Sequence, residues 1–204
     1  MPQLYAHDPF LLVQHALTAP WLDPVMALFT TACEGWAMAL LAAAFVAWRE
    51  RRAGETVRVL APLYLALLLA GALVQGLKAL VGSPRPLAVL GAAAVHVQLE
   101  PLYWNSFPSG HSASVAALAV FALVRYRARA WPLAVLALLG GTSRVYVGAH
   151  WVTDVLGGWA LGALAALAAT PLFEAVSRGV RALTRSGPPG GQSSDRSGRA
   201  SRDA

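Results

Sequence analysis

The chain has little of what a soluble enzyme normally carries. Charged side chains make up 13% of its 204 residues, whereas a soluble domain has about 25%. Its only cysteine, Cys33, excludes a disulfide framework and a cysteine-based metal site. The ten acidic residues are dispersed, so we expect no carboxylate cluster for a divalent metal and no cofactor. No basic region precedes the first apolar run, so we expect no cleavable signal peptide.

Apolar residues dominate instead, at 57% of the chain. We expect five membrane-spanning helices, because a helix of about 20 apolar residues crosses the ~30 Å hydrocarbon layer. They are predicted at residues 24–48, 59–77, 109–124, 131–147 and 151–173. Gly157, Gly158 and Gly162 in the fifth span allow close helix packing. A short interfacial helix within 9–22, anchored by Trp21, precedes them.

The fold class that follows is an all-α integral membrane helical bundle. Its expected parts are an N-terminal segment at 1–23, a transmembrane domain at 24–178 and a disordered basic tail at 179–204. Glu34 falls inside the first predicted span, where a lone carboxyl should face the bundle interior. Two roles stay open for it, a structural polar contact and the edge of a substrate path.

The distribution of basic residues predicts both the topology and an anion site. Of sixteen lysines and arginines, thirteen lie on one side of the five-span arrangement, which the positive-inside rule makes cytoplasmic. Basic residues grouped between spans indicate topology rather than nucleic-acid binding, so no nucleic-acid partner is expected. The other three cations are Lys78, Arg85 and Arg144. They lie on the outer side, where the positive-inside rule disfavours cations. Binding of an anion would explain their presence there.

Two segments on the outer side have the chemistry of phosphate binding. Arg85 lies between two prolines that restrict its backbone, and its guanidinium offers two parallel donors to a phosphate. Ser109 is expected to cap a helix, which leaves the amides of Gly110 and His111 pointing out of the helix N-terminus toward an anion. His111 can also supply a proton.

The third segment places a cation, an imidazole and a carboxylate within twelve residues. If the chain is helical from Trp151, His150 and Asp154 lie four residues apart on one face. The carboxylate then holds one ring nitrogen and leaves the other free to attack or to accept a proton. Arg144 is upstream of Gly148, where the chain can turn and bring the guanidinium to face the histidine. An ion pair at a helix end is the structural alternative.

Together the segments read Lys-x6-Arg-Pro, Pro-Ser-Gly-His and Ser-Arg-x5-His-x3-Asp. This pattern resembles the three-part signature of the type 2 phosphatidic acid phosphatase (PAP2) superfamily, in the same order and spacing, and every defining position is filled. The resemblance covers residues 78–154 directly, and the pattern of spans extends it over most of the chain, the tail excluded.

The resemblance implies a metal-independent phosphatase and a role for each residue of the signature. His150 should attack phosphorus and form a phosphohistidine, oriented by Asp154, and His111 should protonate the leaving oxygen. The phosphoryl oxygens should be held by Lys78, Arg85, Ser109, Gly110 and Arg144. Three cations and helix-end amides suit a reaction that depends mainly on positioning and charge stabilisation.

The expected substrate is a lipid phosphate in the cell membrane. Aromatic residues near the three cations mark an active site at the outer membrane–water interface, with the tail in the cytoplasm. The resemblance to the family makes undecaprenyl diphosphate the first choice, followed by phosphatidic acid or phosphatidylglycerophosphate.

Three other functions fit the sequence less well. Vanadium-dependent haloperoxidases resemble the same signature but are soluble. A non-catalytic lipid-phosphate carrier would need only the cations, whereas both histidines are present here. A transporter is disfavoured because no inverted repeat is visible. The sequence does not determine the oligomeric state.

Overall fold

The structure is a computed structural model that describes residue 5 and residues 7–50 and 53–185. These residues fold into helices, with no strand in the described ranges, so the predicted all-α class is confirmed. The elements are α1 (Phe10–Leu17), α2 (Asp23–Ala32), α3 (Gly35–Glu50), α4 (Ala53–Val81), α5 (Pro86–Leu90), α6 (Gly110–Tyr126), the 3-10 helix η2 (Arg127–Ala130), α7 (Trp131–Tyr146) and α8 (Val152–Arg185).

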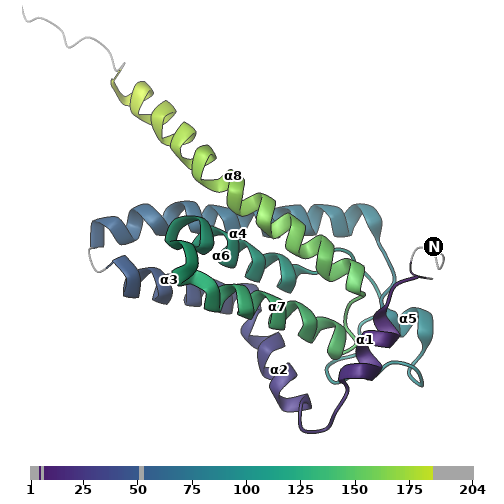
Figure 1. Ribbon diagram of the computed structural model, residues 1–204. Coiled ribbons are helices and arrows are strands. Elements are labelled where there is room, and N and C mark those ends of the chain that lie inside the picture. The colour runs from purple at the N-terminus through teal and green to yellow at the C-terminus, as the bar shows by residue number, and fades with distance from the viewer. Residues whose placement is uncertain (1–4, 6, 51–52, 186–204) are drawn as a thin grey trace, which may run out of the picture.

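Helix α6 lies at the centre of the bundle and packs against α3, α4, α7 and α8 (Figure 1). Its buried face is made largely of alanine, which lets neighbouring backbones approach. Many large apolar side chains point outward, as expected of a bundle surrounded by lipid. Those more than half exposed include Leu40, Leu68, Leu80, Leu138, Leu156, Leu164 and Leu167.

Two glycines bring α8 against the first turns of α6. A Cβ atom at Gly158 would collide with the carbonyl oxygen of Ser109, and one at Gly162 with that of Ala113. The predicted close packing of this span is therefore confirmed. This packing also joins two segments of the site, because the Ser109 amide, at the start of α6, donates to the backbone carbonyl of Asp154, in α8, at 3.0 Å.

Basic residues gather at one end of the bundle, as the sequence predicts. Arg125, at the end of α6, pairs with Glu50, at the end of α3, at 3.3 Å. Arg58 and Arg178 line a single cavity between α4 and α8. The three cations of the signature lie at the opposite end, where α4 and α7 end and α5 begins (Figure 1).

The number of spans remains a prediction. Two stretches, Gly54–Leu90 and Val152–Val180, are long and apolar enough to cross a membrane. A third span is formed if α2 and α3, which meet at a bend of 74°, are counted as one. Helices α6 and α7 have 17 and 16 residues, slightly fewer than the ~20 of a typical transmembrane helix.

The prediction of a continuous helix over 24–48 is wrong, because α2 ends at Ala32 and α3 begins at Gly35. Glu34 lies in this break, where its carboxylate accepts a hydrogen bond from the indole nitrogen of Trp36 at 2.5 Å. This contact is local and exposed rather than in the bundle interior, so both roles left open for Glu34 stay predictions. The next residue, Gly35, lines the candidate site.

The fifth predicted helix is longer than expected. Helix α8 continues to Arg185, so residues 179–185 are helical rather than disordered. Beyond the apolar run the helix carries a Glu174–Arg178 pair at 3.7 Å, four residues apart, and such pairs support an exposed helix. Residues 186–204, the rest of the predicted tail, lie outside the described residues.

The predicted N-terminal helix is present as α1, and its position at the membrane interface stays a prediction. The buried Gln14 fixes α1 to the bundle by donating to the backbone carbonyls of His96 and Tyr146, each at 3.1 Å. The segment 87–107 contains most of the short helix α5 and is otherwise free of helix and strand.

Candidate active site

Six of the eight predicted site residues line one cavity of about 400 Å³ at the end of the bundle opposite the basic side chains. They come from three helices and two loops, and they are Lys78, Arg85, Gly110, His111, Arg144 and His150. The other two, Ser109 and Asp154, are fully buried behind its wall. Three segments far apart in sequence therefore converge, as predicted.

The turn between α7 and α8 places His150 beside Arg144. The backbone carbonyl of Arg144 accepts hydrogen bonds from the amides of Ala149 at 3.0 Å and His150 at 3.2 Å. Gly148 makes this turn with φ +74°, where a Cβ would approach the His96 carbonyl oxygen to 2.8 Å. The predicted turn at Gly148 is thus confirmed, and its reason is both conformational and steric.

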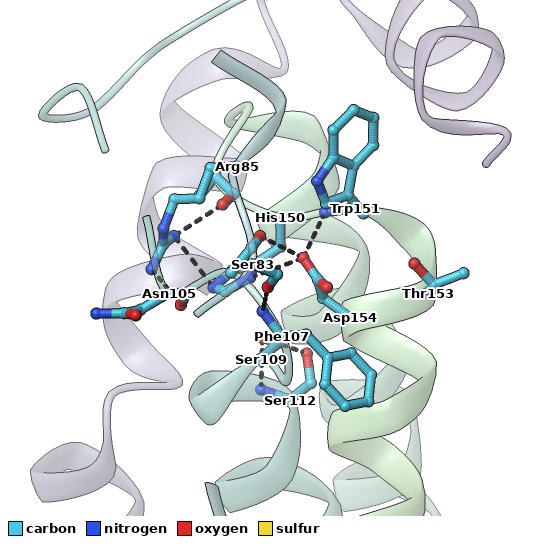
Figure 2. Close-up of polar contacts among 12 residues, drawn as sticks. Ser83, Arg85, Asn105, Phe107, Ser109, Ser112, His150, Trp151, Thr153 and Asp154 are labelled. Carbon is cyan, nitrogen blue, oxygen red and sulfur yellow. Dashed lines mark hydrogen bonds and ion pairs between the residues drawn. The ribbon is translucent and has the colours of Figure 1, made fainter. Parts of the chain in front are cut away.

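His150 lies between Arg85 and the Asp154 carboxylate (Figure 2). Its Nδ1 is 3.3 Å from Asp154 Oδ2, and its Nε2 is 3.3 Å from a guanidinium nitrogen of Arg85. Since the carboxylate accepts from Nδ1–H, the lone pair is left on Nε2, which faces the cation. This tautomer is the one required for attack through Nε2.

The surroundings of His150 keep it neutral. Its side chain is 2% exposed, and burial lowers the pKa of His150 well below the usual value. The nearby cations Arg144, Arg85 and Lys78 lower this pKa further. A neutral imidazole retains the lone pair that a nucleophile needs.

The Asp154 carboxylate is oriented by three donors that converge on Oδ2. Besides His150, they are the Trp151 amide at 2.9 Å and the Ser106 hydroxyl at 2.5 Å. Sequence reasoning missed Ser106, which is fully buried. Its signal was slight, because a lone serine three residues before Ser109 belongs to no part of the signature.

Arg85 is held mainly by backbone carbonyl groups. Its guanidinium donates to the carbonyls of Ala149 at 2.7 Å, Trp104 at 2.9 Å and Asn105 at 3.4 Å. With the His150 contact, four of its five N–H groups are engaged. An incoming phosphate would therefore replace the His150 contact and leave the guanidinium in place.

Arg144 is held from the other side of the cavity, by α2. It donates to the Thr30 hydroxyl at 2.7 Å, a partner that the sequence gave no reason to expect. Its Nε is buried and has no hydrogen-bond partner among the described residues. A buried guanidinium nitrogen without an acceptor is costly, and an anion in the cavity would supply one.

The N-terminus of α6 forms another wall. Ser109 is its N-cap, and its hydroxyl oxygen accepts from the Ser112 amide at 3.4 Å and the Ser112 hydroxyl at 2.9 Å. Gly110 and His111 line the cavity, and their first-turn amides have no carbonyl of their own helix to bond. Since Ser109 lies behind this wall, its direct contact with phosphate stays a prediction.

The cavity also continues one helical turn deeper into the bundle. Gln75 lies one turn below Lys78 on α4, and Ser114 one turn below His111 on α6; both line the cavity. Neither was singled out from the sequence. Within the described residues no three histidine, cysteine or carboxylate side chains are grouped as a metal site; metal independence stays a prediction.

A family model described as the PAP2 superfamily matches residues 59–178, more than half of the chain. The chain therefore belongs to the PAP2 superfamily.

Individual relatives match shorter stretches. Undecaprenyl-diphosphatase BcrC of Bacillus subtilis (strain 168) is 40% identical over 74 residues, 36% of this chain and 37% of that protein. Phosphatidylglycerophosphatase B of the same strain is 46% identical over 70 residues, 29% of this chain and 34% of that protein. The matches thus span about a third of these relatives.

The structural comparison covers more of the chain. The crystal structure of Aquifex aeolicus LpxE aligns with a TM-score of 0.65 and 29% identity, over 78% of this chain and 91% of that chain. The membrane bundle and the arrangement of its helices are therefore shared with a solved structure over most of its length.

Proposed function

We propose that the protein is an integral membrane phosphatase that hydrolyses a phosphomonoester or diphosphate of a lipid through a phosphohistidine on His150. The observation that carries this proposal is the neutral, carboxylate-held His150 in a cavity lined by Lys78, Arg85 and Arg144. A binding protein needs the cations, but it has no use for a buried histidine oriented by a carboxylate.

The reaction follows from the positions of these groups. Nε2 of His150 attacks phosphorus, and a P–N bond forms while the bond from phosphorus to the leaving oxygen breaks. His111 gives that oxygen a proton, which its ring takes up when the anionic substrate binds beside it. Water then attacks the phosphohistidine and returns a proton to His111, and cleavage of the P–N bond releases inorganic phosphate and regenerates neutral His150.

The cations stabilise the charge that develops on the phosphoryl oxygens. Arg144 has a buried Nε that finds no partner in the described part of the chain, and Arg85 can exchange its His150 contact for an oxygen. The amides at the start of α6 add two donors of fixed direction. No step requires a metal ion.

The substrate is proposed to be a membrane lipid, and undecaprenyl diphosphate is the first choice. Its second phosphoryl group would lie on the leaving-group side, where Gln75 and Ser114 offer hydrogen bonds one turn deeper than His111. The similarity to an undecaprenyl-diphosphatase supports this choice. Phosphatidylglycerophosphate and phosphatidic acid follow, the former because of the second relative.

The protein is proposed to be a multi-pass protein of the cell membrane with the site facing outward and the C-terminal tail in the cytoplasm. The grouping of basic side chains at the other end of the bundle supports this orientation. A lipid anchored by its own tail would then reach the site by lateral diffusion.

The test is phosphate release by purified, detergent-solubilised protein in matched mixed micelles. We expect kcat/KM to fall in the order undecaprenyl diphosphate, then phosphatidic acid or phosphatidylglycerophosphate, then glycerol phosphate, with His150→Ala as the inactive control. A soluble ester as good as either lipid would contradict the lipid substrate. Binding of the lipids without release would indicate a carrier.

A further inference from the structure

The N-terminal segment, outside the stretch that the family model matches, packs against the residue that follows the nucleophile. The Tyr5 ring stacks on the Trp151 indole with centroids 4.5 Å apart and planes at 11°. Phe10 meets the same indole edge-on at 5.4 Å. Trp151 in turn donates from its indole nitrogen to the Pro84 carbonyl at 2.9 Å, next to Arg85.

Asp8, in this segment, bridges the N-termini of two helices. Its Oδ1 accepts from the amides of Phe10 at 3.0 Å, at the start of α1, and Val152 at 3.1 Å, at the start of α8. Its Oδ2 accepts from the Thr153 amide at 2.9 Å and the Thr153 hydroxyl at 2.8 Å. Three of these hydrogen bonds join the N-terminal segment to a helix more than 140 residues away.

The first turn of α8 is where the proposed chemistry is anchored. It begins just after His150 and contains Asp154, whose carboxylate accepts a hydrogen bond from the Trp151 amide. The next two amides, of Val152 and Thr153, have no acceptor within their own helix. Asp8 supplies that acceptor, and its negative charge complements the positive end of the helix dipole.

Asp8 and Asp154 therefore hold the same helical turn from two sides. Thr153 lies on the side of α8 away from His150 (Figure 2). Asp8 therefore binds this turn on the side away from the cavity, whereas Asp154 binds it on the side of the cavity. Because α8 starts directly after the loop that carries His150, a frayed first turn would displace both the imidazole and its carboxylate partner.

We propose that Asp8 is a positioning residue for the phosphatase reaction, which fixes the start of α8 and through it the attack geometry of His150. The proposal rests on the function proposed above. Asp8 would act on the chemical step rather than on substrate binding, because the phosphate-holding groups Lys78, Arg85 and Arg144 come from other elements. The N-terminal segment then supplies the active site with a positioning residue.

The experiment compares Asp8→Ala and Asp8→Asn with His7→Ala, a matched control at the exposed neighbouring residue. kcat and KM are measured for a lipid phosphate and for soluble p-nitrophenyl phosphate, on full-length protein that elutes as a single species in detergent. Asp8→Ala should lower kcat about 10- to 100-fold for both substrates, the loss expected for a misplaced reacting group. KM should not change. Asp8→Asn keeps one oxygen acceptor and should lose less.

The outcomes separate this proposal from its alternatives. A wild-type kcat in folded Asp8→Ala would overturn it, and so would a loss confined to KM for the lipid, which would make the N-terminal segment a lipid-docking element. If Asp8→Ala does not fold, Asp8→Asn decides in its place, and an unchanged kcat there would overturn the proposal. Wild type and His7→Ala that both release no phosphate would refute the proposed function itself.

Discussion

Removing the Ser106 hydroxyl should slow the reaction without affecting phosphate binding. The Ser106→Ala variant deletes one of three donors to Asp154 Oδ2. A hydrogen bond to a charged group is worth about 1.5–3 kcal/mol, which corresponds to about 10- to 150-fold in rate if all of it is lost in the transition state. Since the Trp151 amide still holds the carboxylate, we expect a loss of about 10- to 30-fold in kcat.

The assay is steady-state phosphate release at saturating lipid phosphate, with KM measured in the same micelles. Ser177→Ala, a serine near the other end of α8, is the matched control and should behave like wild type. An unchanged kcat in Ser106→Ala, or a loss that appears only in KM, would refute the view that Asp154 is oriented through this hydroxyl.

Three further predictions concern the reacting groups. His150→Ala and His111→Ala should nearly abolish phosphate release, whereas Asp154→Asn should retain more activity, because Asp154 orients the nucleophile and does not itself react; equal losses in all three would contradict these roles. Activity should persist in excess EDTA, and vanadate should inhibit competitively, since it imitates pentacoordinate phosphorus; strict magnesium dependence would contradict the proposed site. Folding lowers the pKa of His150. Below pH about 6.5, the ordinary pKa of histidine, His150 therefore takes up a proton in the unfolded chain but not in the folded protein. Stability should therefore fall as the pH drops from about 6.5 to 5, by up to about 2 kcal/mol, and His150→Gln should reduce this loss in thermal unfolding of the solubilised protein.

Helix positions followed closely from hydropathy, because an apolar run in a membrane protein has few alternatives to a helix. The fourth span was predicted at 131–147, and α7 is Trp131–Tyr146. The break before Gly35 was missed because apolar residues continue on both sides of Glu34. The end of α8 was predicted too early, because that helix continues beyond its apolar run.

The site could be predicted as a set of residues but not as a geometry. The three segments carry charges and histidines that stand out in an apolar chain, which is why six of eight residues line one cavity. The contacts that orient them, from Ser106, Thr30 and Asp8, join segments far apart in sequence. A lone serine, threonine or aspartate has no periodicity or spacing to reveal such a partner.

The central claim is that His150 carries the phosphoryl group, and rapid-quench trapping tests it most directly. Protein is mixed with a lipid phosphate labelled with ³²P in its terminal phosphoryl group, quenched in alkaline detergent and assayed for label on the polypeptide. We expect a transient label that is stable in base and labile in acid, as a phosphoramidate is, and that is lost in His150→Ala. Label of equal amount in His150→Ala, or turnover by wild type with no labelled protein at any quench time, would contradict it.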